Sequence, residues 1–110
     1  MLGIVVVAYK SFDDTVAFVR QELPKITLPH KTVVVDLGSD AAFVTKQAEA
    51  CQAELVEPAD AACDRNADLF MIHVEENLGF AKGNNLGVQF LMQNFPAVQW
   101  LLISNNDIGL

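Results

Sequence analysis

The sequence has few positive charges and few cysteines, and both shortages exclude classes of protein. Seven lysines and arginines stand against fourteen acidic residues in a chain of 110, which gives a formal charge of −7. The basic residues are scattered, whereas a nucleic-acid groove needs clustered cations to meet the phosphates. Cys51 and Cys63 are too few for a disulfide framework and have no zinc-ligand spacing, so we predict them to be small buried side chains.

The chain also lacks a long apolar run and a secretory signal. No run approaches the roughly 18 residues that cross a bilayer, and the N-terminus has no basic region followed by an apolar stretch and a cleavage site. We therefore expect a cytoplasmic protein without a membrane segment. With 52% hydrophobic residues, residues 1–110 are predicted to form a single globular domain that buries a core.

Missing motifs exclude several enzyme classes. Residues 8–12 read Ala-Tyr-Lys-Ser-Phe after the first predicted strand, and without a glycine neither a dinucleotide fingerprint nor a P-loop can form there. A nucleotidyltransferase would also need a glycine-rich basic loop at this point. The chain has no Gly-x-Ser-x-Gly elbow, and neither His30 nor His73 has an evident nucleophile partner. We interpret His73, inside a predicted strand, as a structural histidine.

What the sequence does contain is a regular alternation of apolar runs and helical patterns. The runs predicted to be strands are residues 4–8, 32–36, 69–74 and 98–103. The predicted helices are residues 12–23, 41–53 and about 78–94. Ser39 or Asp40 caps the second helix, and Pro24 ends the first. Residues 54–66 are predicted to be a loop, with a short strand at residues 55–56 left open.

This alternation suits right-handed βαβ crossovers and predicts an α/β fold with a mainly parallel sheet, strand order 3-2-1-4 and helices on both faces. Ligands of such sheets bind beyond the carboxyl ends of the strands, where the strand order reverses. Those ends carry Tyr9, Asp36, Asn77 and Asp107. We therefore expect these four side chains at one edge of the sheet.

The last apolar run leads into a candidate metal site. Residues 100–107 read Trp-Leu-Leu-Ile-Ser-Asn-Asn-Asp, which predicts a buried strand that ends in two amides and a carboxylate. Mg²⁺ and Mn²⁺ commonly take one or two carboxylates and fill their shell with water and phosphate oxygens. Asp107 alone is weak support for such a site, because a helix or turn cap would explain it equally well.

The segment before and inside the third predicted helix is unusually rich in glycine and asparagine. Residues 77–87 hold three of each, although a glycine costs a helix about 1 kcal/mol relative to alanine. Close approach of the backbone, either by a ligand or by a neighbouring strand, is the simplest reason for their presence.

Four segments, in order, resemble the successive motifs of family 2 glycosyltransferases, especially the rhamnosyltransferase-like branch. They are residues 5–11, 33–39, 76–87 and 101–107. The third is the most specific, and together they span nearly the whole chain. The resemblance implies a Rossmann-like GT-A half-domain that binds a UDP-, dTDP- or GDP-linked sugar. In the full-length protein, the sugar would pass with inversion to a hydroxyl of a saccharide or lipid-linked acceptor.

The resemblance also implies residue roles. Nucleotide-sugar contacts are implied for Ala8, Tyr9, Asp36, Gly79, Lys82, Asn84, Asn85, Asn105 and Asn106. Tyr9 would lie against the base, Asp36 would contact the base or ribose, and Asn84 with Asn85 would approach the ribose and diphosphate. Asp107 falls on the Asp-any-Asp motif and would hold the Mg²⁺ or Mn²⁺ that bridges the phosphates.

The chain departs from the family pattern at several points. Lys10 replaces the usual Asn, Leu37 replaces an Asn or Asp that could read the base, and Asn105 replaces the first Asp of the metal motif. The family continues past Leu110 with the acceptor-binding half and the general base. We therefore expect a donor-binding part that transfers no sugar alone and that self-associates through uncovered surface. A non-catalytic nucleotide-binding or interaction module, favoured by Leu37 and Asn105, remains the alternative.

Overall fold

The computed structural model describes residues 1–56, 63–77 and 79–105. These residues form one sheet of five parallel strands in the order β3-β4-β2-β1-β5. The strands are β1 (Leu2–Tyr9), β2 (His30–Leu37), β3 (Glu54–Val56), β4 (Leu69–Val74) and β5 (Trp100–Asn105). The predicted fold class is confirmed, and so is the order 3-2-1-4 of the four predicted strands. The short strand β3 is added at the edge beside β4.

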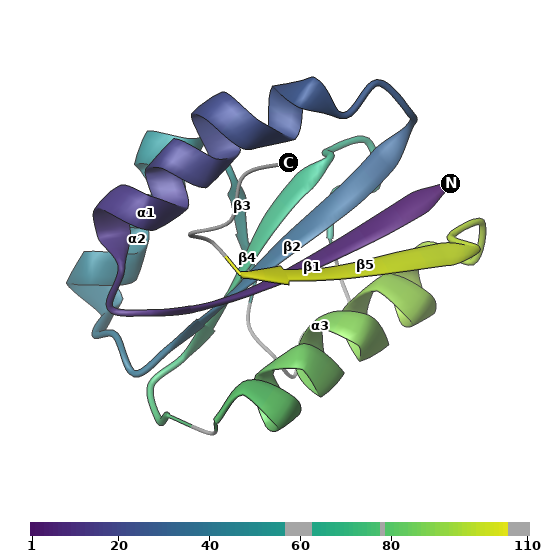
Figure 1. Cartoon of the computed structure of the whole chain (residues 1–110). Coiled ribbons are helices and arrows are strands. Elements are labelled where there is room, and N and C mark those ends of the chain that lie inside the picture. Colours follow the sequence, from purple (N-terminus) through teal and green to yellow (C-terminus); the bar gives the residue numbers. More distant parts are fainter. Residues whose placement is uncertain (57–62, 78, 106–110) are drawn as a thin grey trace.

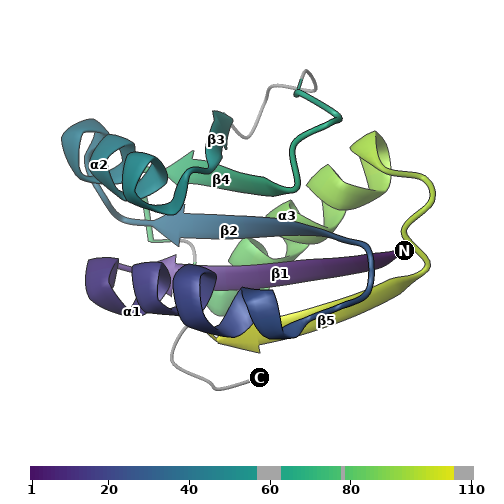
Figure 2. The same cartoon turned by 90° about the horizontal axis from the view of Figure 1, so that it is seen from above.

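Helices cover both faces of this Rossmann-like sheet (Figure 1). One face carries α1 (Phe12–Ala17), its continuation η1 (Phe18–Glu22) and η2 (Leu23–Lys25), and α2 (Ala41–Cys51). The other face carries α3 (Phe80–Asn94), as the view from above also shows (Figure 2). No helix among the described residues is both long and apolar enough to cross a membrane.

The start and end of the first two helices have local causes. Asp40 rather than Ser39 caps α2, since its carboxylate accepts a hydrogen bond of 2.8 Å from the backbone N–H of Phe43. The first helix runs past the predicted end at Leu23, because Pro24 sits in the opening turn of η2, where its missing N–H costs nothing. The π-helical turn η1 carries Phe18 into the core.

Strand β5 corrects the prediction of a buried strand over residues 100–103. The exposed fractions are 71% for Trp100, 43% for Leu101 and 47% for Ile103. Within the described part of the chain, β5 pairs with β1 alone and lies at the edge of the sheet. The apolar sequence by itself did not reveal this edge position.

Two glycines let α3 lie directly on the sheet. A Cβ at Gly87 would be 2.5 Å from Val5 Cγ1, and one at Gly83 would be 3.1 Å from Val7 Cγ1. For these two positions the neighbouring strand, and not a ligand, is the reason for glycine.

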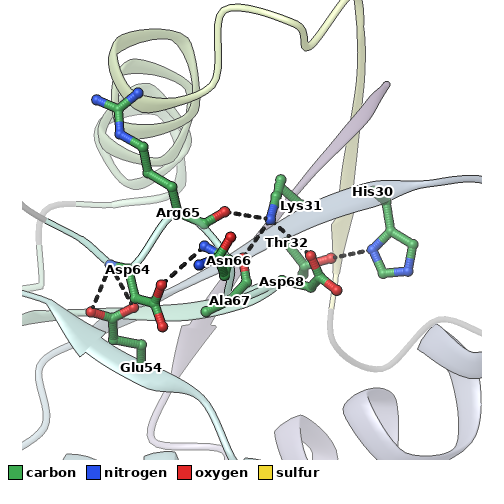
Figure 3. A network of polar contacts seen from close by, with 9 residues as sticks. All are labelled: His30, Lys31, Thr32, Glu54, Asp64, Arg65, Asn66, Ala67 and Asp68. Atoms are coloured by element: carbon green, nitrogen blue, oxygen red, sulfur yellow. Dashed lines mark hydrogen bonds and ion pairs between the residues drawn. The ribbon is translucent and has the colours of Figure 1, made fainter.

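A polar network lies at the amino ends of β2 and β4 (Figure 3). The predicted site is at the opposite, carboxyl ends of the strands. The ammonium of Lys31, on β2, donates to the carbonyls of Arg65 and Ala67 and to the Asp68 carboxylate. Thr32 N–H adds a hydrogen bond of 2.8 Å to Asp68 O. The network fixes the chain segment that enters β4.

Candidate functional site

The carboxyl ends of the parallel strands form one rim of the sheet, and β1 and β5 meet there. Val7 of β1 pairs in register with Asn105 of β5. Both strands run in the same direction, so Tyr9 and Asn105 end neighbouring strands at the same rim. The connections from β1 and into β5 cross opposite faces of the sheet, which makes this the point where the strand order reverses. Asn106 and Asp107 lie outside the described residues.

Tyr9 is the central aromatic group of this rim. Its side chain is 47% exposed, and its ring lies against Gly38 at the end of β2. A Cβ at Gly38 would be 2.8 Å from Tyr9 Cε2 and 3.8 Å from Asn77 Cβ, and the φ of +80° also requires glycine here. Tyr9, Gly38 and Asn77 therefore converge from the carboxyl ends of β1, β2 and β4.

A hollow of about 270 Å³ adjoins Gly38. It is lined by Lys10, Gly38, Ser39, Asp40 and Phe43. Lys10 has a left-handed backbone with φ of 48°, and its Nζ lies 5.4 Å from the centroid of the Tyr9 ring. The rim thus combines an exposed aromatic ring with a cation.

Sequence reasoning did not assign Lys10 or Phe43 to a site. Lys10 was noted only as a departure from the motif, and the apolar spacing of residues 41–53 predicts that Phe43 lies on the buried side of its helix. Phe43 is instead half-buried beside the hollow, because it lies in the first turn of α2 at the rim. The cap at Asp40 was the signal that could have located this turn.

Asp36 does not join the rim, contrary to its predicted contact with the base or ribose. Its side chain is fully buried, and the carboxylate accepts hydrogen bonds of 3.0 Å from Ser39 Oγ and from Gln47 Nε2. His73 lies beside it and donates from Nε2 to the Ser39 carbonyl at 2.9 Å, which is a structural role. In this structure Asp36 holds the start of α2 and offers no atom to a nucleotide.

Burial is the strongest influence on the pKa of Asp36. Removal from water raises the pKa of the carboxyl above its ordinary 3.8, against the lowering effect of hydrogen bonds from Ser39 and Gln47 and of the charge of His73. Gln47 Oε1 is buried nearby without a hydrogen-bond partner. Gln47 Oε1 could therefore accept one further hydrogen bond.

We expect Asp36→Asn to stabilise the protein at pH 7, because the neutral amide avoids the cost of a buried carboxylate charge. Because the folded-state pKa is raised, the contribution of Asp36 is full below pH 3.8 and is lost as the pH rises through the folded pKa. The neutral Asn amide escapes this loss. Urea unfolding at about pH 3.5 and at about pH 7 measures the difference.

The matched control is Asp40→Asn, which keeps the cap of α2 and should change stability by less than about 0.5 kcal/mol at either pH. A parent protein more stable than Asp36→Asn at pH 7 would contradict the interpretation, because it would mean that the pocket prefers the ionised carboxylate.

The predicted asparagine pair of α3 is divided between two sides of the helix. Residues advance by about 100° each, and Gly83 and Gly87 face the sheet, so Asn85 points away from it. Asn85 lines a hollow of 250 Å³ on the outer side of α3, together with Lys82, Leu86 and Gln89. Lys82 and Asn85 thus line a different hollow from the one that adjoins Gly38.

Asn84 lies on the flank of α3 that faces β1 and β5. It is seven residues before Leu91, which reaches β1 beside Leu101, and positions seven apart share a helix face. The Oδ1 atom of Asn84 is buried without a hydrogen-bond partner. An unpaired buried amide oxygen is costly, so a donor that reached this atom would relieve that cost.

The remaining residues with predicted nucleotide-sugar contacts are Gly79, Ala8 and Asn105, and they differ in how accessible they are to a ligand. Gly79 precedes α3 with a φ of +82° and has no atom within 4 Å of where a Cβ would lie, so space is open at the start of this helix. Ala8 is 1% exposed and has no side-chain surface for a ligand. Asn105 is described by its backbone only.

Within residues 1–56, 63–77 and 79–105, no three His, Cys, Asp or Glu side chains are grouped to hold a metal ion. The predicted ligand, Asp107, lies beyond these ranges. Comparisons of the chain with protein-family models, with curated proteins and with solved structures gave no match.

Proposed function

We propose that this chain is the donor-binding part of a glycosyltransferase and binds a nucleotide diphosphate sugar. The observation that supports this most is the Tyr9 ring, half-exposed and held against Gly38 at the rim where the strand order reverses. A nucleobase has a flat face that stacks on such a ring. The order and spacing of the four motif-like segments support a nucleotide sugar, and not a base alone, as the ligand.

The rest of the rim suits the diphosphate and the sugar. The acidic chain offers Lys10 next to Tyr9 as a local cation. The N-terminus of α3 has no side-chain cap and open space at Gly79, so its backbone N–H groups can face an anion. Asn84 supplies an unpaired amide oxygen on the side of α3 toward β1 and β5, where a ribose hydroxyl could donate to it.

We propose that the nucleotide sugar binds together with a divalent ion. Asp107, with Asn105 and Asn106, would hold Mg²⁺ or Mn²⁺, and the backbone of β5 runs out of the sheet beside β1 in the direction this requires. When bound, the ion would offset the charge that develops on the departing nucleoside diphosphate. The acceptor, a saccharide or lipid-linked hydroxyl, would attack with inversion in the full-length enzyme.

The test is a calorimetric titration of the purified chain with UDP, dTDP and GDP, each with and without Mn²⁺. We expect at least one of the three to bind with an affinity that Mn²⁺ increases. Tyr9→Ala should weaken that binding about tenfold, the lower part of the 1–3 kcal/mol range for stacking of a base on an aromatic ring. Absence of binding by all three nucleotides would overturn the proposal.

Two further variants separate the roles. Tyr9→Phe keeps the ring and should bind within about twofold of the parent, because stacking and not the hydroxyl is the proposed contact. Asp107→Ala should remove the effect of Mn²⁺ and leave the metal-free affinity. Nucleotide binding that never responds to Mn²⁺ would favour the alternative, a non-catalytic nucleotide-binding module with this fold.

A further inference from the structure

Asp40 brings a carboxylate to the hollow beside Gly38. Its Oδ1 atom accepts the hydrogen bond from the N–H of Phe43 that caps α2. A carboxylate has a second oxygen, and Oδ2 takes no part in this cap. Lys10 lines the same hollow, yet within the described part of the chain it forms no ion pair with Asp40. The hollow therefore contains a carboxylate oxygen that can accept hydrogen bonds from a ligand.

The side chains that the sequence pattern would use to read a base do not line this hollow. Asp36 is buried and bonded to Ser39 and Gln47. Leu37 is apolar and 1% exposed. Among the described residues that line the hollow, Asp40 is the one carboxylate. An acidic contact with a ligand bound there would therefore come from Asp40, which the sequence indicated only as a helix cap.

The hollow adjoins the place where a base would stack on Tyr9. The Tyr9 ring lies against Gly38, and Gly38 is part of the wall of the hollow. Phe43 adds an apolar part of the wall and packs edge-on against Phe12, with the ring centroids 5.9 Å apart. At about 270 Å³ the hollow is smaller than the roughly 300–1,000 Å³ of pockets that enclose a whole drug-sized ligand. Its size suits the base alone and not the complete nucleotide sugar.

We propose that Asp40 selects guanine, so that the donor is a GDP-linked sugar. This inference rests on the proposed function, because it names the base of the nucleotide sugar. Guanine presents two N–H donors side by side, N1–H and the N2 amine, and a carboxylate can accept both in a charge-assisted contact. Uracil and thymine present one N–H between two carbonyl oxygens, and adenine and cytosine place a ring-nitrogen acceptor next to their amine. Guanine therefore offers the carboxylate the most donors.

Charge favours the same base. The chain carries −7 and a diphosphate is anionic, so a carboxylate in the site weakens binding unless it meets donors. Lys10 is the cation for the diphosphate in the proposed function, and the lack of an ion pair with it leaves the Asp40 carboxylate to the base. Uracil and thymine would turn a carbonyl oxygen toward Asp40 on either side of their N–H. Asp40 thus selects guanine both by attraction to it and by repulsion of its competitors.

Calorimetric titration with GDP, UDP, dTDP and inosine diphosphate, each in the presence of Mn²⁺, tests the selection. Inosine diphosphate is GDP without the N2 amine, so the comparison of these two isolates one donor. We expect GDP to bind about tenfold more tightly than each of the other three, which is the effect of one hydrogen bond to a charged group. This comparison uses the parent chain and does not depend on the folding of a variant.

Asp40→Asn keeps the cap of α2 and changes the contact with the base. The cap holds the amide oxygen toward the N–H of Phe43, so a donor, the amide nitrogen, replaces Oδ2. The preference for GDP over inosine diphosphate should fall from about tenfold to within about twofold. The matched control is Asp13→Asn, in the exposed first turn of α1, which removes the same charge outside the hollow and should keep the preference.

Three results would overturn the selection of guanine and leave the proposed function standing. They are tightest binding of UDP or dTDP, equal binding of GDP and inosine diphosphate by the parent, and an equal loss of both in Asp40→Asn, which would place the carboxylate at the ribose. Absence of binding by all four nucleotides would overturn the selection and the proposed function together. Circular dichroism of each variant verifies that the fold is kept.

Discussion

Gly87→Ala should lower the free energy of unfolding by about 2 kcal/mol. The new methyl group would lie 2.5 Å from Val5 Cγ1, a distance that forces either β1 or α3 to move. Overpacking of this kind costs up to roughly 3 kcal/mol, and the better helix propensity of alanine returns about 1 kcal/mol. Urea denaturation followed by circular dichroism gives the free energy directly.

Gly83→Ala provides the graded comparison for this prediction. Its methyl group would lie 3.1 Å or more from its neighbours, so the propensity gain and the packing cost should nearly cancel, within about 1 kcal/mol. Asn85→Ala, on the side of α3 away from the sheet, should be neutral or slightly stabilising. Equal losses for Gly87→Ala and Gly83→Ala would mean that α3 does not sit on the sheet as described.

The fold was predictable because its signals are local. Unalternated runs of valine and isoleucine indicate strands covered on both faces, and the helical spacing between them indicates crossovers. Together they yield a parallel sheet and a strand order. The apolar runs do not reveal how many neighbours each strand has. Trp100 and Ile103 were therefore expected in the interior of the sheet, whereas they lie on the edge strand of its described part.

The candidate site was predictable in outline and not in detail. The exits of β1, β2 and β5 share one rim, as parallel strands require. Side-chain direction was the missing information, because Asp36 alternates with Val35 and Leu37 and so points under α2. Adjacent helical residues diverge by about 100°, so Asn84 and Asn85 could not both face one ligand.

The glycines of residues 77–87 could be explained in two ways from the sequence. The sequence left ligand approach and strand approach open for all three glycines. The structure assigns strand approach to Gly83 and Gly87, whose missing Cβ atoms would meet β1 and β2. Only Gly79 retains open space and a positive φ, so the support that this segment gives to nucleotide binding rests on one glycine and on Asn84.

Lys31→Met should be the most destabilising single change at the other end of the sheet, with a loss of about 3 kcal/mol in the free energy of unfolding. The ammonium donates three hydrogen bonds, of 3.0 Å to Arg65 O, 2.6 Å to Ala67 O and 2.8 Å to Asp68 Oδ1. Hydrogen bonds to a charged group contribute roughly 1.5–3 kcal/mol each, although partly exposed partners regain water. Methionine keeps the apolar stem of the side chain, so the loss reports on the ammonium. Chemical denaturation at neutral pH measures it.

Asp68→Ala distinguishes the ion pair from the carbonyl contacts. The Asp68 side chain is 71% exposed, and exposed ion pairs contribute at most about 1 kcal/mol. A loss from Asp68→Ala as large as that from Lys31→Met would contradict the assignment of the stability to the two carbonyl acceptors. Both residues are at the amino ends of the strands, so nucleotide binding at the Tyr9 rim should be unchanged in every variant of this network that still folds.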